Sequence, residues 1–261
     1  MKCIQKIGIA LEGGGAKGAY EIGVLKAILE LGIQYDCVAG TSIGALNAVA
    51  YVLGDYERYY SGWSDMNFSF VGKKNRTQNV KVFNINEIVN NIEVENEYLN
   101  SNGINPENII NMFKENIDEN CVRKSKINFG ISTYCLTDKK PLNIFIDDIP
   151  EGMLHEYIFA SCNLPVFTPR PINGKYYLDG SVTNHLPVDM IAEKGYKTII
   201  AVRLRKDTYD FSKYKNIKII DIAPDEYLSD TLQASQKRIR WMIDKGYEDA
   251  IKILNDNISV F

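Results

Sequence analysis

The feature that most constrains the fold is the order of elements at the start of the chain. The apolar pattern at 6–11 predicts a strand, which a glycine-rich loop joins to a predicted helix ending at Gly32. A second buried strand is predicted at 36–39, followed by a tight turn and a helix at 43–53. This alternation of strands and helices is typical of a mainly parallel sheet covered by helices on both faces. We therefore expect an α/β fold.

The segment 55–125 differs in character from what precedes it. Asn, Glu and Lys dominate it, and helical patterns occur near 86–92 and 106–117. Such a segment can form a helical cap over a site, or it can form peripheral helices that gate nothing. No internal repeat, low-complexity segment or linker interrupts the chain, so we predict a single domain over 1–261.

Strand patterns return in the second half of the chain. A helix at 154–161 is predicted among strands at 127–136, 142–146, 198–203 and 217–222. The chain closes with an amphipathic helix, whose apolar stripe we expect to pack onto the sheet rather than enter a membrane. The stripe consists of Leu232, Ile239, Ile243, Tyr247, Ile251 and Leu254.

Charge and cysteine content argue against several classes of function. The 261 residues carry a formal net charge of -3 and the sequence pI is about 5.6, so the basic face that nucleic-acid binding needs is not evident. The five cysteines are scattered and form no C-x-x-C pair, which argues against a disulfide framework or a zinc site and favours a reducing compartment. One basic cluster is interpreted as a solvated loop or as a contact with anionic lipid heads; it consists of Lys73, Lys74, Arg76 and Lys81.

The start of the chain shows no targeting segment. Residues 1–6 run directly into the first strand pattern, without a charged and then apolar leader. The longest apolar run, 43–53, is too short to span a bilayer. We expect a cytoplasmic protein that can make transient contact with a membrane surface.

A serine turn lies between the second predicted strand and the helix after it. It reads Gly40-Thr41-Ser42-Ile43-Gly44, a G-x-S-x-G motif. A nucleophilic serine at such a turn adopts a strained backbone, and glycine two residues to either side avoids a collision. The N-terminus of the next helix also adds positive potential where an oxyanion would form. The motif alone leaves a second interpretation open, in which the hydroxyl caps that helix.

The glycine-rich loop after the first strand admits two functions. In one, the unobstructed amides of Gly13, Gly14, Gly15 and Ala16 point at one oxygen and stabilise its negative charge during acyl transfer. In the other, the loop with Lys17 and Gly18 is a G-x-G-x-x-G motif that binds a dinucleotide.

The dinucleotide interpretation lacks its usual acidic residue. A ribose-binding acid is expected at the end of the second strand, but Asp36 stands at the start of that strand. A P-loop is excluded because Lys17 is followed by Gly18 rather than Ser or Thr. Lys17 either bonds to backbone carbonyls of the loop or is solvated.

A serine nucleophile needs a base, and the chain has only two histidines. His155 lies in a helical pattern, and His185 follows Asp179 too closely for the usual Asp-to-His separation of a Ser-Asp-His triad. Asp179 ends a strand pattern beside apolar residues, where partial desolvation would make its carboxylate a stronger base. Taken alone, the segment favours an ordinary Asp-Gly turn, which is common.

Taken together, three segments resemble the patatin-like phospholipase family. They are Gly-Gly-Gly-Ala-Lys-Gly at 13–18, Gly-Thr-Ser-Ile-Gly at 40–44 and Asp-Gly-Ser at 179–181, in the family's order and approximate spacing. The stretches 160–167 and 184–188 resemble the segments before and after the family's aspartate. The resemblance covers most of 6–205, and 55–125 adds nothing to it.

The resemblance implies both a fold and an activity. The fold is a three-layer α/β/α sandwich, and the activity is hydrolysis of lipid acyl esters by a Ser42–Asp179 dyad without a catalytic histidine. The amides around Gly14 and Gly15 would form the oxyanion hole, and Gly40, Gly44 and Gly180 would support the turns. Ser181 departs from the family, which usually has Gly or Ala there, and this hydroxyl could alter hydrogen bonding to Asp179.

Three other functions remain open beside lipid hydrolysis. A thioesterase or an acyltransferase would use the same site on other acyl substrates. The chain could also bind a dinucleotide, or keep the fold without catalysing a reaction. The proposed chemistry requires neither a metal nor a cofactor.

Overall fold

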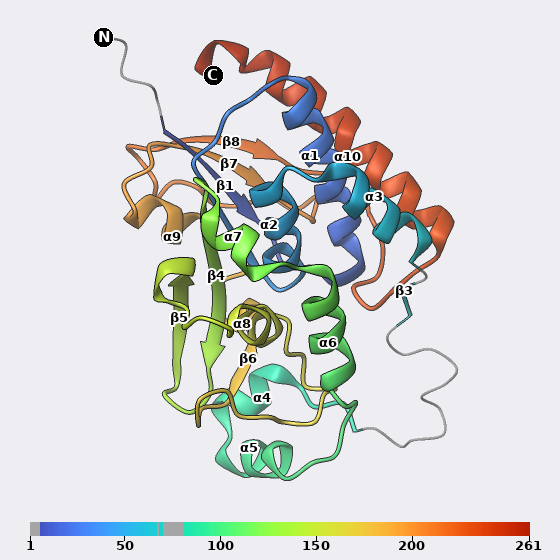
Figure 1. The fold of residues 1–261 in the computed structure, drawn as a ribbon, viewed down its shortest axis with the longest axis vertical. Coiled ribbons are helices and arrows are strands. Elements are labelled where there is room, and N and C mark those ends of the chain that lie inside the picture. The colour runs from blue at the N-terminus through green and yellow to red at the C-terminus, as the bar shows by residue number, and fades with distance from the viewer. Residues whose placement is uncertain (1–5, 67, 70–80) are drawn as a thin grey trace.

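A mainly parallel sheet runs through the described part of the chain, which comprises residues 6–66, 68–69 and 81–261 of a computed structural model (Figure 1). The strands are β1 (Ile7–Leu11), β2 (Cys37–Thr41), β3 (Phe68–Ser69), β4 (Asn128–Cys135), β5 (Lys140–Phe145), β6 (Tyr177–Asp179), β7 (Thr198–Val202), β8 (Lys218–Ile222) and β9 (Gln233–Ala234). The sheet has the order β5-β4-β2-β1-β7-β8, with β6 also paired to β4. The strands from β4 to β8 along this order are parallel, whereas β5 and β6 run antiparallel to β4. β3 and β9 form a separate pair.

Helices cover both faces of this sheet. The α-helices are α1 (Ala19–Glu30), α2 (Ile43–Leu53), α3 (Tyr56–Asp65), α4 (Ile85–Asn90), α5 (Ile92–Leu99), α6 (Glu107–Asn116), α7 (Glu119–Lys124), α8 (Leu154–Ser161), α9 (Val188–Glu193) and α10 (Gln236–Asp256). Short 3-10 helices occupy Gly15–Gly18, Ile146–Asp148, Gly180–Val182 and Ile258–Val260.

The alternation of side chains along β1 explains the layers. Ile9 and Leu11 point into the larger core, which they share with α1, α2, α8 and α10. Ala10 points to the other face and belongs to the core formed with Val188 and Ile191 of α9. Successive residues of a strand face opposite sides of a sheet, so a strand that is apolar throughout needs cover on both sides. The predicted α/β fold with helices on both faces of a mainly parallel sheet is confirmed.

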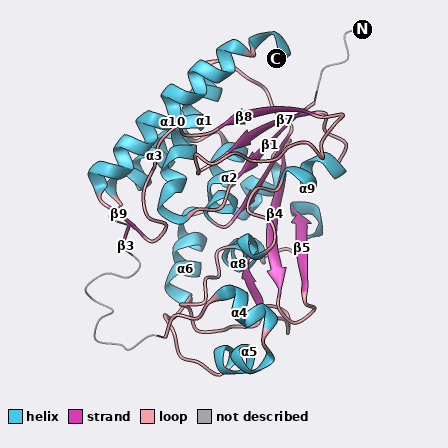
Figure 2. Cartoon of the chain, turned by 180° about the vertical axis from the view of Figure 1, so that it is seen from behind, coloured by secondary structure: helices cyan, strands magenta, loops and turns pink. Residues whose placement is uncertain are grey.

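The closing helix packs mainly on another helix, and the expectation that it packs onto the sheet is therefore wrong in its main contact. α10 lies along α1 in both views (Figures 1 and 2). Glycines allow this close approach: a Cβ on Gly23 would lie 1.9 Å from the carbonyl oxygen of Ile243, and one on Gly246 would lie 2.0 Å from that of Tyr20. The apolar stripe thus faces α1 first, with a smaller contact to β8.

The described residues of the segment 55–125 contain five helices rather than the two predicted patches. The pattern near 86–92 is split into α4 and α5 because the side chain of Asn91 accepts hydrogen bonds from the amides of Glu93 and Val94 and so begins a new helix. α4 and α5 lie beyond the ends of β4 and β6, whereas α3 and α6 lie closer to α2 (Figure 1).

Candidate active site

Ser42 occupies a sharp turn between β2 and α2. Its backbone has φ 55° and ψ -125°, a left-handed conformation that residues with a Cβ rarely adopt. A Cβ on Gly40 would lie 2.1 Å from the carbonyl oxygen of Gly44, and a Cβ on Gly44 would lie 2.6 Å from that of Leu11. The Ser42 hydroxyl makes no capping hydrogen bond to α2, so the interpretation of this serine as a mere helix cap does not hold.

Strand β4 brings Ser42 and Asp179 together. Along one edge of β4, β2 pairs in parallel as far as Thr41, which lies opposite Ser132. On the same edge β6 runs in the opposite direction and ends with Asp179 opposite Thr133, the next residue of β4. The two strands therefore approach each other end to end. Their ends place the candidate residues Ser42 and Asp179 at the same point, although 137 residues separate them in the chain.

The two side chains form a hydrogen bond. The hydroxyl of Ser42 donates to Oδ2 of Asp179 at 2.5 Å. Asp179 is only 1% exposed, and this burial raises the pKa of its carboxyl above 3.8, while hydrogen bonds from Ser181 and Ser42 act in the opposite direction. A desolvated carboxylate with a raised pKa is a stronger base than one on the surface.

Asp179 also forms the Asp-Gly turn that its segment suggested. Its Oδ1 accepts a hydrogen bond from the amide of Ser181 at 2.9 Å. A Cβ on Gly180 would lie 2.2 Å from the carbonyl oxygen of Ser132, which explains the glycine. The two interpretations of this segment thus describe the two oxygens of one carboxylate: Oδ1 stabilises the turn, and Oδ2 contacts the serine.

Neither histidine contacts this pair in the described structure. His155 is buried, and its Nε2 lies 2.8 Å from the carbonyl oxygen of Ile117. The Nδ1 of His185 lies 3.2 Å from a guanidinium nitrogen of Arg205. Burial, together with the positive charges of Arg205 and Lys17, lowers the pKa of His185 and favours the neutral ring. The geometry matches a pair rather than a triad.

Two amides of the glycine loop donate no hydrogen bond to any described residue. The amide of Gly13 donates to the carbonyl of His185 at 2.9 Å, and that of Ala16 donates to the carbonyl of Thr231 at 2.8 Å. These two amides are not available to an oxyanion, so the prediction that Gly13 and Ala16 donate to it is wrong. The amides of Gly14 and Gly15 make no hydrogen bond within the described part of the chain.

The loop is packed directly against the serine turn. A Cβ on Gly13 would lie 3.2 Å from the Cβ of Ser42, and a Cβ on Gly18 would lie 2.6 Å from Cγ1 of Ile43. The carbonyl of Gly18 accepts a hydrogen bond from Nδ2 of Asn47 at 2.9 Å. The ammonium of Lys17 makes no hydrogen bond or ion pair within the described residues, so the interpretation in which it bonds to carbonyls of the loop does not hold. Burial and the charge of Arg205 lower its pKa.

One residue of the candidate site, Ser161, was not predicted from the sequence. The amide of Ser42 donates to Oγ of Ser161 at 2.8 Å, and the Ser161 hydroxyl donates to the carbonyl of Ser132 at 2.6 Å. Ser161 is fully buried at the end of α8. It lies within the stretch that resembles the segment ahead of the family's aspartate, which was the only signal available. Its role depends on β4, a part of the sheet that the sequence does not place beside it.

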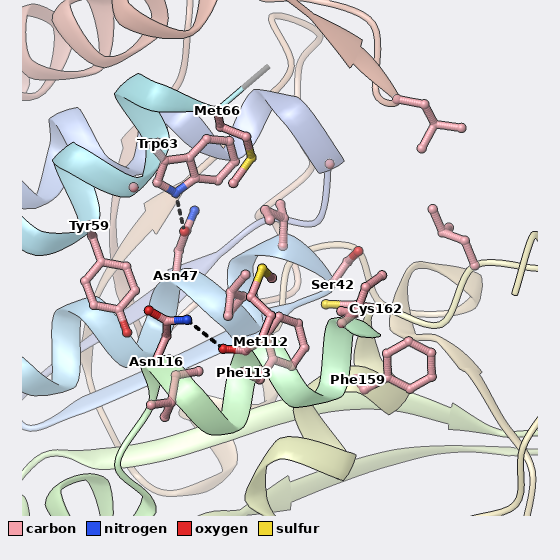
Figure 3. Close-up of a pocket in the computed structure, with 18 of the residues that line it drawn as sticks. Ser42, Asn47, Tyr59, Trp63, Met66, Met112, Phe113, Asn116, Phe159 and Cys162 are labelled. Carbon is pink, nitrogen blue, oxygen red and sulfur yellow. Dashed lines mark hydrogen bonds between the residues drawn. The ribbon is translucent and has the colours of Figure 1, made fainter. Parts of the chain in front are cut away.

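An apolar cavity of about 540 Å³ opens beside Ser42 (Figure 3). This volume lies within the range of about 300–1,000 Å³ that is usual for small-molecule sites. Its walls come from α2, α3, α6 and α8, so two helices of the 55–125 segment line it. Large apolar residues predominate in these walls, among them Leu46, Trp63, Met66, Met112, Phe113, Phe159 and Phe167.

Other predicted features fall away from this site or outside the described residues. Asp36 accepts a hydrogen bond from the amide of Ile7 at the start of β1, at the sheet edge opposite the glycine loop, which disfavours dinucleotide binding. Within the described residues there is no cluster of His, Cys, Asp or Glu able to hold a metal ion, and no helix has the length and apolar character needed to cross a bilayer. Of the predicted basic cluster, Lys73, Lys74 and Arg76 lie outside the described residues.

Comparison with known proteins identifies the family to which the chain is similar. A family model described as Patatin-like phospholipase matches residues 9–192. The chain is 28% identical over 219 residues to Patatin-like phospholipase domain-containing protein 7 of Rattus norvegicus, covering 80% of this chain and 14% of that protein. It is 27% identical over 203 residues to Lysophospholipase NTE1 of Kluyveromyces lactis, covering 76% of this chain and 12% of that protein. The chain thus spans about a seventh of the length of the curated relatives that it matches.

A solved structure shows the same fold. VipD from Legionella pneumophila superposes with a TM-score of 0.56 at 16% sequence identity, over 97% of this chain and 67% of that chain. At this level of identity the likeness concerns the arrangement of the elements.

Proposed function

Because this chain belongs to the patatin-like phospholipase family, we propose that it is a serine lipid acyl hydrolase of the phospholipase A or lysophospholipase type. The observation that carries the proposal is the hydrogen bond of 2.5 Å from Ser42 to Asp179 at the edge of an apolar cavity. A hydroxyl paired with a buried carboxylate supplies a nucleophile and its base, and the cavity provides room for an acyl chain.

In the first step the enzyme is acylated. Asp179 takes the proton of the Ser42 hydroxyl while Oγ attacks the ester carbonyl carbon. The carbonyl oxygen becomes an oxyanion, which the amides of Gly14 and Gly15 stabilise; one such donor typically contributes about 2.7–4 kcal/mol to the transition state. The bond to the alcohol oxygen then breaks, and Asp179 returns the proton to that oxygen. The products of this step are an acyl ester on Ser42 and a free alcohol.

In the second step water releases the fatty acid. Asp179 takes a proton from a water molecule, whose oxygen attacks the acyl carbonyl carbon, and the same two amides hold the oxyanion. The bond to Ser42 Oγ breaks, and the proton returns from Asp179 to that oxygen. Two observations support a pair without histidine: the two side chains contact each other directly, and each imidazole has another hydrogen-bond partner.

The proposal includes a location and an architecture. A lipid ester resides in or near a membrane, so we propose a cytoplasmic protein that contacts the membrane surface transiently. Met112, which is 43% exposed and also lines the cavity, favours this contact. We also propose one catalytic domain over residues 1–261, in which α3 and α6 of the 55–125 segment act as a cap on the acyl site.

Hydrolysis of a short-chain nitrophenyl ester and of a lysophospholipid tests the function. Ser42→Ala and Asp179→Asn should each lower kcat by at least about 10²–10³-fold, since each removes a group that acts in the transition state. Ser61→Ala, at an exposed serine of α3, should retain wild-type rates. Undiminished activity in either site variant would refute the mechanism, and cleavage of acyl-CoA without cleavage of oxygen esters would indicate a thioesterase instead.

A further inference from the structure

Gly62 is the one described glycine whose missing side chain the fold does not explain. Every other described glycine either has a left-handed backbone, as Gly54 does with φ 65°, or has a neighbour that a Cβ would crowd, as at Gly23. At Gly62 a Cβ would have no neighbour within 4 Å, and the backbone is not left-handed. Neither a turn nor close packing accounts for this glycine.

The position of Gly62 makes the glycine costly. It lies in the interior of α3, where glycine destabilises a helix relative to alanine because the unfolded chain has more freedom to lose. A larger residue would fit the fold at this position without strain. The presence of glycine therefore requires another explanation.

Gly62 is itself exposed, and the space beside it is part of the open cavity at Ser42. The residues of α3 that line this cavity recur every three or four positions, which is one face of the helix, and Gly62 lies at the centre of that face. They are Arg58, Tyr59, Gly62 and Trp63, and Met66 follows directly after the end of the helix. In Figure 3 Tyr59 and Trp63 lie on the opposite side of the pocket from Ser42 and Cys162. This face therefore lines the part of the cavity that is remote from the reacting atoms.

We propose that Gly62 is a specificity-determining position: the distal part of the acyl chain passes over the bare backbone there, and the absence of a side chain sets the length of chain accepted. The inference rests on the proposed function for its substrate class. An alkyl chain fits this surface because Trp63 on α3, Met66 just after α3, and Met112 on α6 are large and apolar. A chain buried along this face gains affinity with each methylene group.

Gly62→Leu tests the proposal through kcat/KM for a series of nitrophenyl esters from butyrate to palmitate. The leucine side chain would occupy the distal space, so palmitate hydrolysis should fall by about tenfold or more, whereas butyrate hydrolysis should stay within about twofold. Gly62→Ala should give a smaller loss on palmitate and a higher Tm, because a helix gains from alanine. Ser61→Leu, the same side chain added to the neighbouring exposed position of α3, should leave the ratio of the two esters unchanged.

An unchanged ratio of palmitate to butyrate hydrolysis in Gly62→Leu would overturn the proposal, as would an equal loss on both esters. If the wild-type protein cleaves no ester, the proposed function fails, and binding of the fluorescent fatty acid cis-parinaric acid decides this inference separately. Weaker binding by Gly62→Leu than by Ser61→Leu would support the distal acyl site, and equal binding would refute it.

Discussion

Ser42 is held in its left-handed conformation by a hydroxyl that lies 119 residues further along the chain. The buried amide of Ser42 has the Oγ of Ser161 as its partner, and Ser161 is fixed in turn by the carbonyl of Ser132. A strained backbone persists only where its surroundings determine it. The position of the proposed nucleophile therefore depends on a residue that need not touch the substrate.

Ser161→Ala should damage both stability and rate. It leaves the amide of Ser42 buried without a partner, which costs about 1–3 kcal/mol, and it should lower kcat more than it changes KM because it misplaces the nucleophile. Ser132→Ala is the matched control, since the Ser132 hydroxyl is buried without a partner in the described structure and only its carbonyl serves the network. Equal kinetics for the two variants would contradict a positioning role for Ser161.

The pH profile of activity should report on Asp179. The base must be ionised to accept a proton, so kcat/KM should fall as pH drops through the pKa of Asp179, which burial holds above 3.8. Ser181→Ala removes the hydrogen bond from the Ser181 side chain, which lowers this pKa, and keeps the one from its amide, so the acid limb should move to higher pH. A limb that does not move, or that moves to lower pH, would argue against Asp179 as the titrating group.

At this scale the motifs led to the proposed reacting pair but not to the residues around it. G-x-S-x-G and Asp-Gly each impose local backbone geometry, and that geometry is legible in the sequence at Ser42 and Asp179. The availability of an amide is not local: carbonyls of His185 and Thr231, distant in the chain, engage Gly13 and Ala16. Ser161 acts through such a distant contact too.

At the scale of elements, the close packing of α1 against α10 depends on one glycine in each helix. Gly23 and Gly246 let each helix approach the backbone of the other. The periodicity of α10 was legible in the sequence, whereas its partner was not. An apolar stripe indicates that one face of a helix is buried, but it does not indicate which surface covers that face. The only sequence signal for a helical partner is a glycine in each helix, Gly23 in α1 and Gly246 in α10.

Gly23→Ala should be strongly destabilising. Its Cβ would lie 1.9 Å from the carbonyl oxygen of Ile243, a backbone atom that cannot move aside without shifting α10. Overpacking of this kind costs about 1–3 kcal/mol or more, which denaturant unfolding would measure. Gly62→Ala provides the comparison, since the same substitution in another helix should stabilise by about 0.5–1 kcal/mol. Similar effects at both positions would contradict the packing described for α1 and α10.

At the scale of the whole molecule, the directions of the strands determine where the residues of the proposed site meet. The parallel strands could be anticipated from the opening order of elements, and with them the edge at which the glycine loop and the serine turn meet. The reversal of β6 could not, because a three-residue strand carries little pattern. That reversal turns Asp179 back toward Ser42.

A second buried carboxyl links global stability to pH. Glu21 is fully buried, its Oε2 accepts a hydrogen bond from Asn47, and burial raises its pKa well above 4.5. As pH rises past about 4.5 the unfolded chain loses this proton before the folded protein does, so stability falls. Glu21→Gln should therefore unfold like the wild type at lower pH and become increasingly more stable than it as pH rises. A constant difference across that range would show that Glu21 does not titrate differently on folding.

The most direct test of the central claim is labelling with a fluorophosphonate, followed by mapping of the adduct by mass spectrometry. We expect one adduct, on Ser42, formed at the wild-type rate in His155→Gln and His185→Asn, formed far more slowly in Asp179→Asn and absent from Ser42→Ala. An adduct on another residue, undiminished labelling of Asp179→Asn, or loss of labelling in a histidine variant that remains folded would contradict a Ser42–Asp179 pair.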